Sequence, residues 1–166
     1  MKLYVMRHGP AEDVSASGHD HDRVLTRRGK DRVRDVATLL AREGELPERI
    51  LTSRLARANE TAAILASIAE HKGWAGSVET APEMAPGGKN GDLVLRLLAE
   101  GKASLVVGHE PDLSSLIDQL LHDPFPLPMD KAMVVALELE AEAPAKLRFI
   151  VDPVAVAVVH DTRERS

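Results

Sequence analysis

The run LYVMRHGP at residues 3–10 decides the fold. Its first four residues are apolar and predict a buried strand, which ends where Gly9 and Pro10 interrupt regular structure. A second run of this kind, SLVVGHEP, occupies residues 104–111, and a shorter one, RILTS, occupies residues 49–53. Each predicted strand is followed at once by polar or charged residues, which are the candidates for a functional site.

The segments between these strands have the spacing of amphipathic helices. Thr26 is a predicted N-cap for a helix that ends near Gly44, and its apolar residues lie three or four positions apart: Val33, Val36, Ala37 and Leu40. Ser53 is a predicted N-cap for a second helix that reaches about Lys72. Further helices are predicted at 92–99 and 111–121, and strands at 132–139 and 147–151. Residues 153–160 suit either an edge strand or a subunit contact, and we expect 161–166 to fray.

This alternation of short apolar strands with helices predicts an α/β sandwich with a mostly parallel central sheet. We read the chain as a single domain spanning residues 1–166, which fits the usual domain size. In such sheets, ligands bind at the carboxyl ends of the strands. The predicted strand ends carry Arg7 and His8, the segment 53–57, and His109, so these residues are expected to converge.

Composition narrows the classes of function. Hydrophobic residues make up 44% and charged residues 28% of the chain, a balance typical of globular proteins. Aromatic residues make up only 2% and the net charge is −5, which argues against nucleic-acid binding through stacked rings or a basic surface. The absence of cysteine excludes disulfides, thiolate zinc sites and cysteine nucleophiles. No run is long enough for a signal or membrane segment, so we expect no membrane partner and a cytoplasmic location.

The residues at the strand ends describe a phosphate-sized site. Arginine guanidiniums bind phosphate oxygens in pairs, and a neutral imidazole can attack phosphorus. Arg57 lies one turn into the second predicted helix, and His109 precedes the start of another, both electropositive positions. Taken singly, a strand-end arginine, a solvated helix arginine or a histidine satisfied by backbone would explain each residue as well. Together they predict two histidines and two arginines around one anion.

Four motifs in order then resemble the histidine phosphatase superfamily. They are MRHG at 6–9, LTRRG at 25–29, TS at 52–53 followed by RANETA at 57–62, and VGHEP at 107–111. Within the superfamily, the short chain looks most like the SixA-type phosphohistidine phosphatases. The resemblance implies a three-layer α/β/α sandwich of the phosphoglycerate mutase-like kind, and a covalent mechanism that needs no cofactor or metal.

By this resemblance, His8 is the nucleophile, Arg7 and Arg57 hold phosphate oxygens, and His109 donates to the transferring phosphoryl group. We expect the two guanidiniums to depress the pKa of His8 and so to keep its imidazole neutral. Glu83 is the candidate general acid, because relatives carry a carboxylate at about this separation from the arginine motif. An exposed loop glutamate beside Pro82 is the alternative reading. Phosphohistidine demands little of an acid, because its imidazole leaving group departs more readily than an alkoxide.

Three features depart from the pattern or lie outside it. Arg54 stands where a proline commonly follows the serine, which could add a positive contact. His19 and His21 flank Asp20 and invite a metal reading, but a solvated loop is the better interpretation because no third ligand stands at a diagnostic spacing. Basic residues crowd one stretch and predict either a charged outer helix face, which we favour, or a surface that steers an acidic phosphoprotein: Arg23, Arg27, Arg28, Lys30, Arg32 and Arg34.

Three functions are therefore open. The first is a phosphatase acting on phosphohistidine in a partner protein, favoured because relatives that act on small metabolites often carry insertions over the site, whereas only residues 82–92 could cover it here. The second is a phosphatase for small phosphomonoesters or phosphoanhydrides using the same residues. The third is a non-catalytic phosphate-binding module, against which the presence of both His8 and His109 counts.

Overall fold

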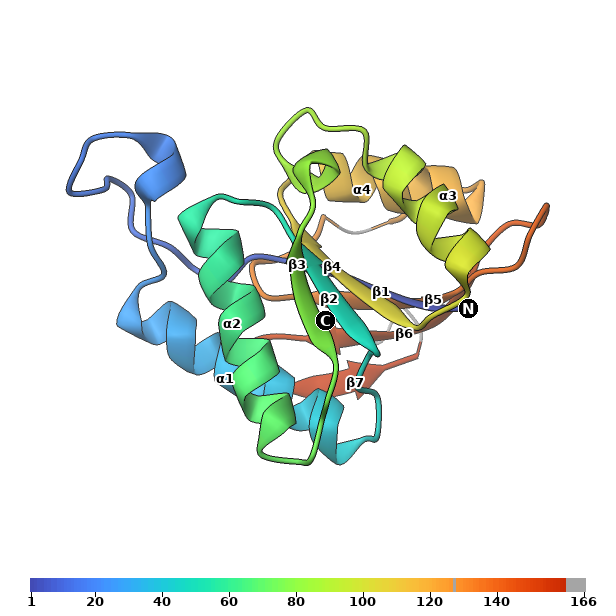
Figure 1. Cartoon of the computed structure of the whole chain (residues 1–166), viewed down its shortest axis with the longest axis horizontal. Helices are drawn as coiled ribbons and strands as arrows, with labels where there is room; N and C mark the ends of the chain where they lie inside the picture. The colour runs from blue at the N-terminus through green and yellow to red at the C-terminus, as the bar shows by residue number, and fades with distance from the viewer. Residues whose placement is uncertain (127, 161–166) are drawn as a thin grey trace.

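The computed structural model describes residues 1–126 and 128–160, so the tail predicted to fray lies outside the described residues. A seven-stranded sheet in the order β3-β2-β4-β1-β5-β6-β7 is flanked by α1 and α2 on one face and by α3 and α4 on the other (Figure 1). The strands are β1 (Lys2–Arg7), β2 (Arg49–Thr52), β3 (Ser77–Thr80), β4 (Ser104–Gly108), β5 (Val134–Glu138), β6 (Lys146–Asp152) and β7 (Ala157–Val159). The helices are α1 (Arg27–Arg42), α2 (Ala56–Glu70), α3 (Asn90–Glu100) and α4 (Asp112–Leu121).

The sheet has a parallel half and an antiparallel half. Strands β3, β2, β4 and β1 pair in parallel, whereas β1 with β5, β5 with β6, and β6 with β7 pair antiparallel. Five of the seven strands, β1 to β4 and β6, consequently run in the same direction, which confirms the mostly parallel sheet. The three-layer α/β/α architecture is confirmed as well.

The register of the parallel half aligns the ends of three strands. In β1 and β4, Arg7 lies opposite Gly108, and in β2 and β4, Thr52 lies opposite Val107. Because β4 lies between β1 and β2, the residues that follow these three parallel strands lie side by side at the carboxyl-terminal edge of the sheet. This edge receives His8, Ser53 and His109.

Alternation along β1 explains the two layers of the core. Tyr4 and Met6 face the cluster beneath α1 and α2, while Leu3 and Val5 face the cluster beneath α3 and α4. All four side chains are at most 1% exposed. A strand buried on both faces reads as a continuous apolar run, which is why residues 3–6 marked the centre of the fold.

Most predicted elements are confirmed, and one predicted cap is wrong. The Thr26 hydroxyl accepts a hydrogen bond from the Gly29 amide at 2.9 Å and begins α1 as expected. Ser53 does not cap the second helix, because α2 begins at Ala56 with Leu55 as its N-cap residue, and the Ser53 hydroxyl is engaged elsewhere. The segment 153–160 contains β7, which confirms the edge-strand alternative.

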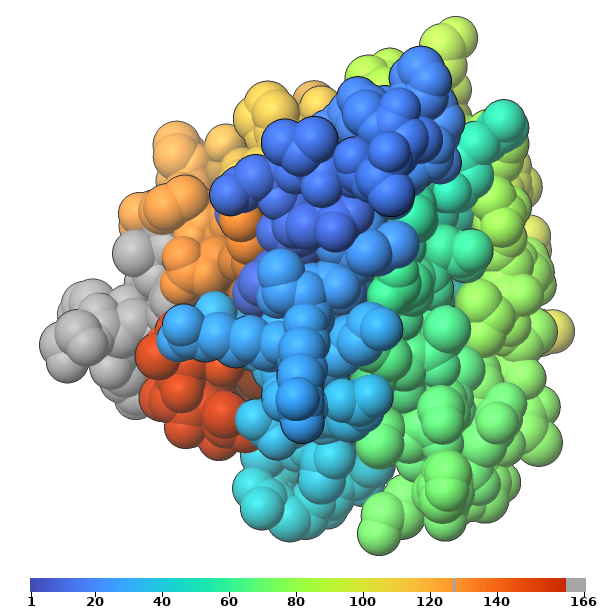
Figure 2. All heavy atoms as spheres, turned by 90° about the vertical axis from the view of Figure 1, so that its left-hand side faces the viewer, coloured from blue at the N-terminus to red at the C-terminus, as the bar shows by residue number. Residues whose placement is uncertain are grey.

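The basic stretch around α1 is largely a charged outer face. Lys30 lies 3.9 Å from a Glu60 oxygen, and Arg34 lies 2.9 Å from an Asp31 oxygen. Figure 2 shows this face, with α1 below the loop that precedes it and α2 beside both. No helix in the described part of the chain is both long enough and apolar enough to cross a membrane.

Candidate active site

The chain leaves β1 through His8, whose imidazole is fixed by its own neighbour. The Nδ1 atom of His8 lies 2.8 Å from the carbonyl oxygen of Gly9. A carbonyl oxygen only accepts hydrogen bonds, so Nδ1 carries the proton and the lone pair is on Nε2. Gly9 suits this turn because a Cβ there would lie 2.6 Å from the Val33 Cγ2 atom, and its amide donates to the Thr61 hydroxyl at 3.0 Å.

His109 meets His8 from the end of β4. The two ring centroids are 5.2 Å apart with an interplanar angle of 48°. Both side chains are buried, at 6% exposure for His8 and 5% for His109. The Nε2 atom of His109 lies 2.7 Å from the hydroxyl of Ser53, and its buried Nδ1 atom has no hydrogen-bond partner among the described residues.

Two arginines reach the same edge of the sheet and are held in different ways. Arg7 donates through Nη1 to the carbonyl oxygen of Met129 at 2.8 Å. Arg57 donates through Nη1 to the carbonyl oxygen of Asp20 at 3.0 Å and through Nη2 to the Asp20 carboxylate at 3.2 Å. In both arginines the Nε–H is buried and unpaired within residues 1–126 and 128–160. These free donors are the kind of group that binds an oxyanion.

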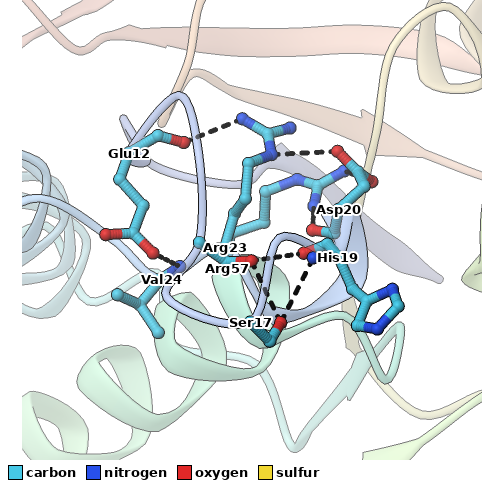
Figure 3. Close-up of polar contacts among 8 residues, drawn as sticks. Glu12, Ser17, His19, Asp20, Arg23, Val24 and Arg57 are labelled. Carbon is cyan, nitrogen blue, oxygen red and sulfur yellow. Dashed lines mark hydrogen bonds and ion pairs between the residues drawn. The ribbon is translucent and has the colours of Figure 1, made fainter.

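The loop that carries Asp20 is itself tied down (Figure 3). Arg23 donates from Nε to the Asp20 carboxylate at 2.9 Å and from Nη1 to the Glu12 carbonyl oxygen at 3.0 Å. The loop contains a short 3-10 helix, η1 (Asp20–Asp22), which packs against α2. The loop thereby places Asp20 over the guanidinium of Arg57.

Both imidazoles are neutral at physiological pH. Burial, followed by the charges of His109, Arg57 and Arg7, lowers the pKa of His8 to about 3. Burial, followed by Arg57, lowers the pKa of His109 to about 4. The sequence led us to expect the guanidiniums as the cause for His8, but the larger cause is loss of water around the ring.

Glu83 is oriented toward an arginine of α3. It lies in the 3-10 helix η2 (Pro82–Met84), and its Oε1 atom accepts a hydrogen bond from Arg96 at 2.7 Å, while Oε2 is buried and unpaired among the described residues. A hydrogen bond from its own backbone amide, together with Arg96, lowers the pKa of the Glu83 carboxyl. Glu83 is therefore ionised near neutral pH, a state in which it cannot donate a proton. The general-acid role stays a prediction.

The remaining candidates lie outside this constellation. The rings of His19 and His21 stack at 5.3 Å, and the described residues contain no group of three or more histidine, aspartate or glutamate side chains suited to a metal ion. Arg54 is exposed and lines a surface pocket with His21 and Asp22.

Sequence reasoning missed two contacts of the site, Ser53 with His109 and Asp20 with Arg57. The partners are separated by 56 and 37 positions in the sequence. Helix-cap propensity gave Ser53 a different role, and nothing in the polar segment 11–23 distinguishes Asp20 from its neighbours. The position of Ser53 directly after a predicted strand was the one available signal.

Comparison with known proteins agrees with this geometry. Residues 3–84 match the histidine phosphatase superfamily (branch 1). The chain is 30% identical over 157 residues to the phosphohistidine phosphatase SixA of Escherichia coli strain K12, covering 92% of this chain and 94% of that protein. It is 40% identical over 119 residues to an uncharacterized protein of Picosynechococcus, with 68% of each chain covered.

A solved structure shows the same fold. The protein histidine phosphatase SixA complexed with tungstate superposes with a TM-score of 0.84 at 28% identity, and the match covers 95% of this chain and all of that one. The expected phosphoglycerate mutase-like architecture is thereby confirmed, and a phosphatase activity is supported. The chain belongs to the histidine phosphatase superfamily.

Proposed function

We propose that this protein removes phosphoryl groups from phosphohistidine in a partner protein, with His8 as the nucleophile. The observation that carries the proposal is the pair of buried, neutral imidazoles 5.2 Å apart, together with Arg7 and Arg57, whose charges act on both rings and whose Nε–H groups are unpaired among the described residues. A neutral Nε2 has the lone pair that attack on phosphorus requires. The adjacent cationic donors match the charge of the transferring group.

The proposed reaction has two displacements. In the first, the Nε2 lone pair of His8 forms a bond to phosphorus, the bond from phosphorus to the substrate imidazole breaks, and that imidazole takes up a proton from water. In the second, a water molecule forms a bond to phosphorus and gives one proton to the solvent, while the bond from phosphorus to Nε2 breaks and its electron pair returns to the neutral imidazole of His8, releasing inorganic phosphate. Arg7 and Arg57 hold the equatorial oxygens in both steps, and His109 donates a hydrogen bond to one of them.

Glu83 is the proposed proton donor for substrates with poorer leaving groups. Its carboxylate would have to leave Arg96 and take up a proton before it could act, since its lowered pKa keeps it ionised near neutral pH. An imidazole leaving group makes a smaller demand on an acid than an alkoxide does. This difference favours phosphohistidine over alkyl phosphates for the present arrangement.

The names of the relatives support a protein substrate. The E. coli relative is a phosphohistidine phosphatase, and the SixA structure is a complex with tungstate, a tetrahedral oxyanion like phosphate. In this proposal the segment from η2 to the start of α3 serves as the short cover over the site. It is fixed by the Gly87 amide, which donates to the Asp112 carboxylate at 2.8 Å. The proposal includes a single catalytic domain over residues 1–166 and a cytoplasmic location.

The test is a substrate panel combined with trapping of the intermediate. The chain is incubated with a phosphohistidine peptide, an aryl phosphate and a set of sugar phosphates, and acid-labile phosphate on His8 is located by mass spectrometry. We expect phosphate on His8 and the highest kcat/KM with the phosphohistidine peptide. Higher values with a sugar phosphate would favour the small-molecule alternative, and phosphate binding without turnover would identify a binding module.

A further inference from the structure

The imidazole of His109 is hydrogen-bonded to the side chain of Ser53, whereas the imidazole of His8 is hydrogen-bonded to a backbone carbonyl. Ser53 follows β2 and His109 follows β4, two neighbouring strands. Ser53 is completely buried and His109 is 5% exposed, so water does not compete for their hydrogen bond of 2.7 Å. When a buried hydroxyl is hydrogen-bonded to one ring nitrogen of an imidazole, that hydrogen bond influences which of the two nitrogens carries the proton.

The surroundings of Ser53 favour one direction for this hydrogen bond, because its oxygen already accepts from a backbone amide. The backbone amide of Leu55 donates to the Ser53 hydroxyl oxygen at 3.3 Å. The hydroxyl still has its own proton to donate, and the Nε2 atom of His109 lies within reach of it. When Nε2 accepts, the single proton of the neutral imidazole is on Nδ1.

The opposite tautomer is unfavourable at both ends. If Nε2–H donated to Ser53, the hydroxyl proton would lack this acceptor in a fully buried position. The buried Nδ1 atom, which is unpaired among the described residues, would then present a lone pair to the oxygens of a bound phosphoryl group. Two lone pairs repel, whereas an Nδ1–H group donates.

We propose that Ser53 is a positioning residue that holds His109 in the Nδ1–H tautomer, so that Nδ1–H donates to the phosphoryl oxygen during transfer. This inference rests on the proposed function. The two histidines thereby present opposite nitrogens to one group. His8 offers the lone pair of Nε2 because its Nδ1 donates to Gly9, and His109 offers the proton of Nδ1 because its Nε2 accepts from Ser53.

The first test measures the tautomer and does not depend on turnover. Nitrogen-15 NMR of the full chain near pH 7 distinguishes protonated from unprotonated ring nitrogens, and the His109 signals are assigned from a His109→Asn spectrum. We expect the wild type to show protonated Nδ1 on His109. In S53A we expect a mixture of tautomers, whereas S53T, which keeps a hydroxyl, should retain the wild-type pattern.

A matched control is available in Ser104, the other fully buried serine of this sheet region. Its hydroxyl contacts Arg49 and the Lys102 carbonyl oxygen at the opposite end of β4. S104A loses a buried hydroxyl of the same kind, so it shows what stability loss alone does. We expect the His109 tautomer and kcat/KM with an aryl phosphate to stay at wild-type values in S104A.

The second test is kinetic. With an aryl phosphate we expect S53A to lower kcat/KM about 10-fold, the lower end of the loss found when the hydrogen-bond partner of a metal-binding imidazole is removed. In a His109→Asn background, whose side-chain amide can donate but has no tautomer to fix, S53A should add less than about twofold. An equal loss in both backgrounds would overturn the positioning role.

The outcomes separate the two proposals. A wild-type spectrum with protonated Nε2 on His109 overturns the tautomer assignment whatever the activity, and so does an unchanged tautomer in S53A. If the spectra behave as expected but no phosphate is trapped on His8, the hydrogen bond is as described and the proposed phosphatase function fails instead.

Discussion

The ends of β1 and β4 both carry a histidine, but the two histidine rings are held by different partners. The strands are parallel neighbours, and each leads through a histidine to the same edge of the sheet. After β1 the ring of His8 is held by the carbonyl of the next residue, Gly9. After β4 the ring of His109 is held by Ser53, which comes from a third strand end.

The first hydrogen bond is a local contact in the sequence, and the second is a long-range contact. The contact between His8 and Gly9 forms within two consecutive residues and needs only the correct turn. The contact between His109 and Ser53 exists only when β2 and β4 are paired. The ring of His8, the proposed nucleophile, is fixed by its own turn, and the ring of His109, the proposed donor, is fixed by the assembled sheet. Different substitutions should therefore disrupt the two.

Removal of the proposed nucleophile, His8, has the largest expected effect. We expect H8A to lower kcat for phosphoryl transfer by about 10⁴-fold or more, because no other described side chain takes the place of Nε2. The measurement is phosphate release from an aryl phosphate. The exposed His71, the residue that follows α2, provides the control variant H71A, which should keep wild-type activity. Substantial turnover in H8A would show that the end of β1 is not the reacting end.

Removal of the proposed hydrogen-bond donor, His109, has a smaller expected effect. We expect H109A to lower kcat/KM by about 10²- to 10³-fold, as for the loss of one hydrogen-bond donor to a developing charge. Phosphate should still be trapped on His8, only more slowly, and rapid-quench analysis of the labelled chain measures that rate. If H109A abolishes the phosphoenzyme altogether, the division between nucleophile and donor is wrong.

The imidazoles of His8 and His109 should both make the stability of the protein depend on pH. In the folded chain the pKa values of His8 and His109 are lowered to about 3 and about 4, against 6.5 for a free histidine, so the unfolded chain binds more protons below pH 6.5. Each histidine then lowers the free energy of unfolding by up to about 1.4 kcal/mol per pH unit as the pH falls from 6.5 toward 4. Urea unfolding of the wild type and H8A across this range measures the difference. We expect the stability of H8A to fall less steeply, and parallel curves would contradict the buried neutral state of His8.

The two glycines beside the histidines allow a matched comparison of stability. A Cβ on Gly9 would lie 2.6 Å from a branched Val33 methyl, whereas a Cβ on Gly108 would lie 2.8 Å from the flexible end of Met84. We expect G9A to cost about 1 to 3 kcal/mol of folding free energy and G108A less, because a methionine end can move aside. Thermal unfolding of both variants decides the order, and a costlier G108A would reverse it.

Replacement of the candidate acid has the smallest expected effect. With a phosphohistidine peptide we expect E83Q to keep kcat/KM within about twofold, because an imidazole leaving group makes little demand on an acid. With an alkyl phosphate we expect a larger loss if Glu83 protonates the leaving oxygen. R96Q removes the same ion pair while keeping the carboxylate, so it separates the proton from the salt bridge.

The sequence was most informative where apolar residues are continuous. Residues 3–6, 49–52 and 104–108 were placed as strands because burial on both faces requires such runs. Strand β3 was missed because its four residues, SVET, are all exposed and contain a single apolar side chain. Its place at the edge of the sheet comes from pairing with β2, which leaves no periodic signal in β3 itself.

The site could be predicted in its parts but not in its connections. The strand-end rule brought Arg7, His8 and His109 to one edge because it depends only on strand direction. The partner of each group depends on side-chain reach across loops and strand ends. Ser53 illustrates the limit: its preference for helix caps is a local property, and the hydrogen bond it makes to His109 is a tertiary one.

The contact between Asp20 and Arg57 has a consequence for how an anion enters. The Arg57 guanidinium is paired through Nη2 with the Asp20 carboxylate from a surface loop, while its Nε–H is unpaired among the described residues. Under the proposed function, a phosphate that takes Nη2 as well as Nε–H would displace the Asp20 carboxylate, so the loss of this ion pair would offset part of the attraction. The return of Asp20 to Arg57 would then compete with retention of the phosphate product.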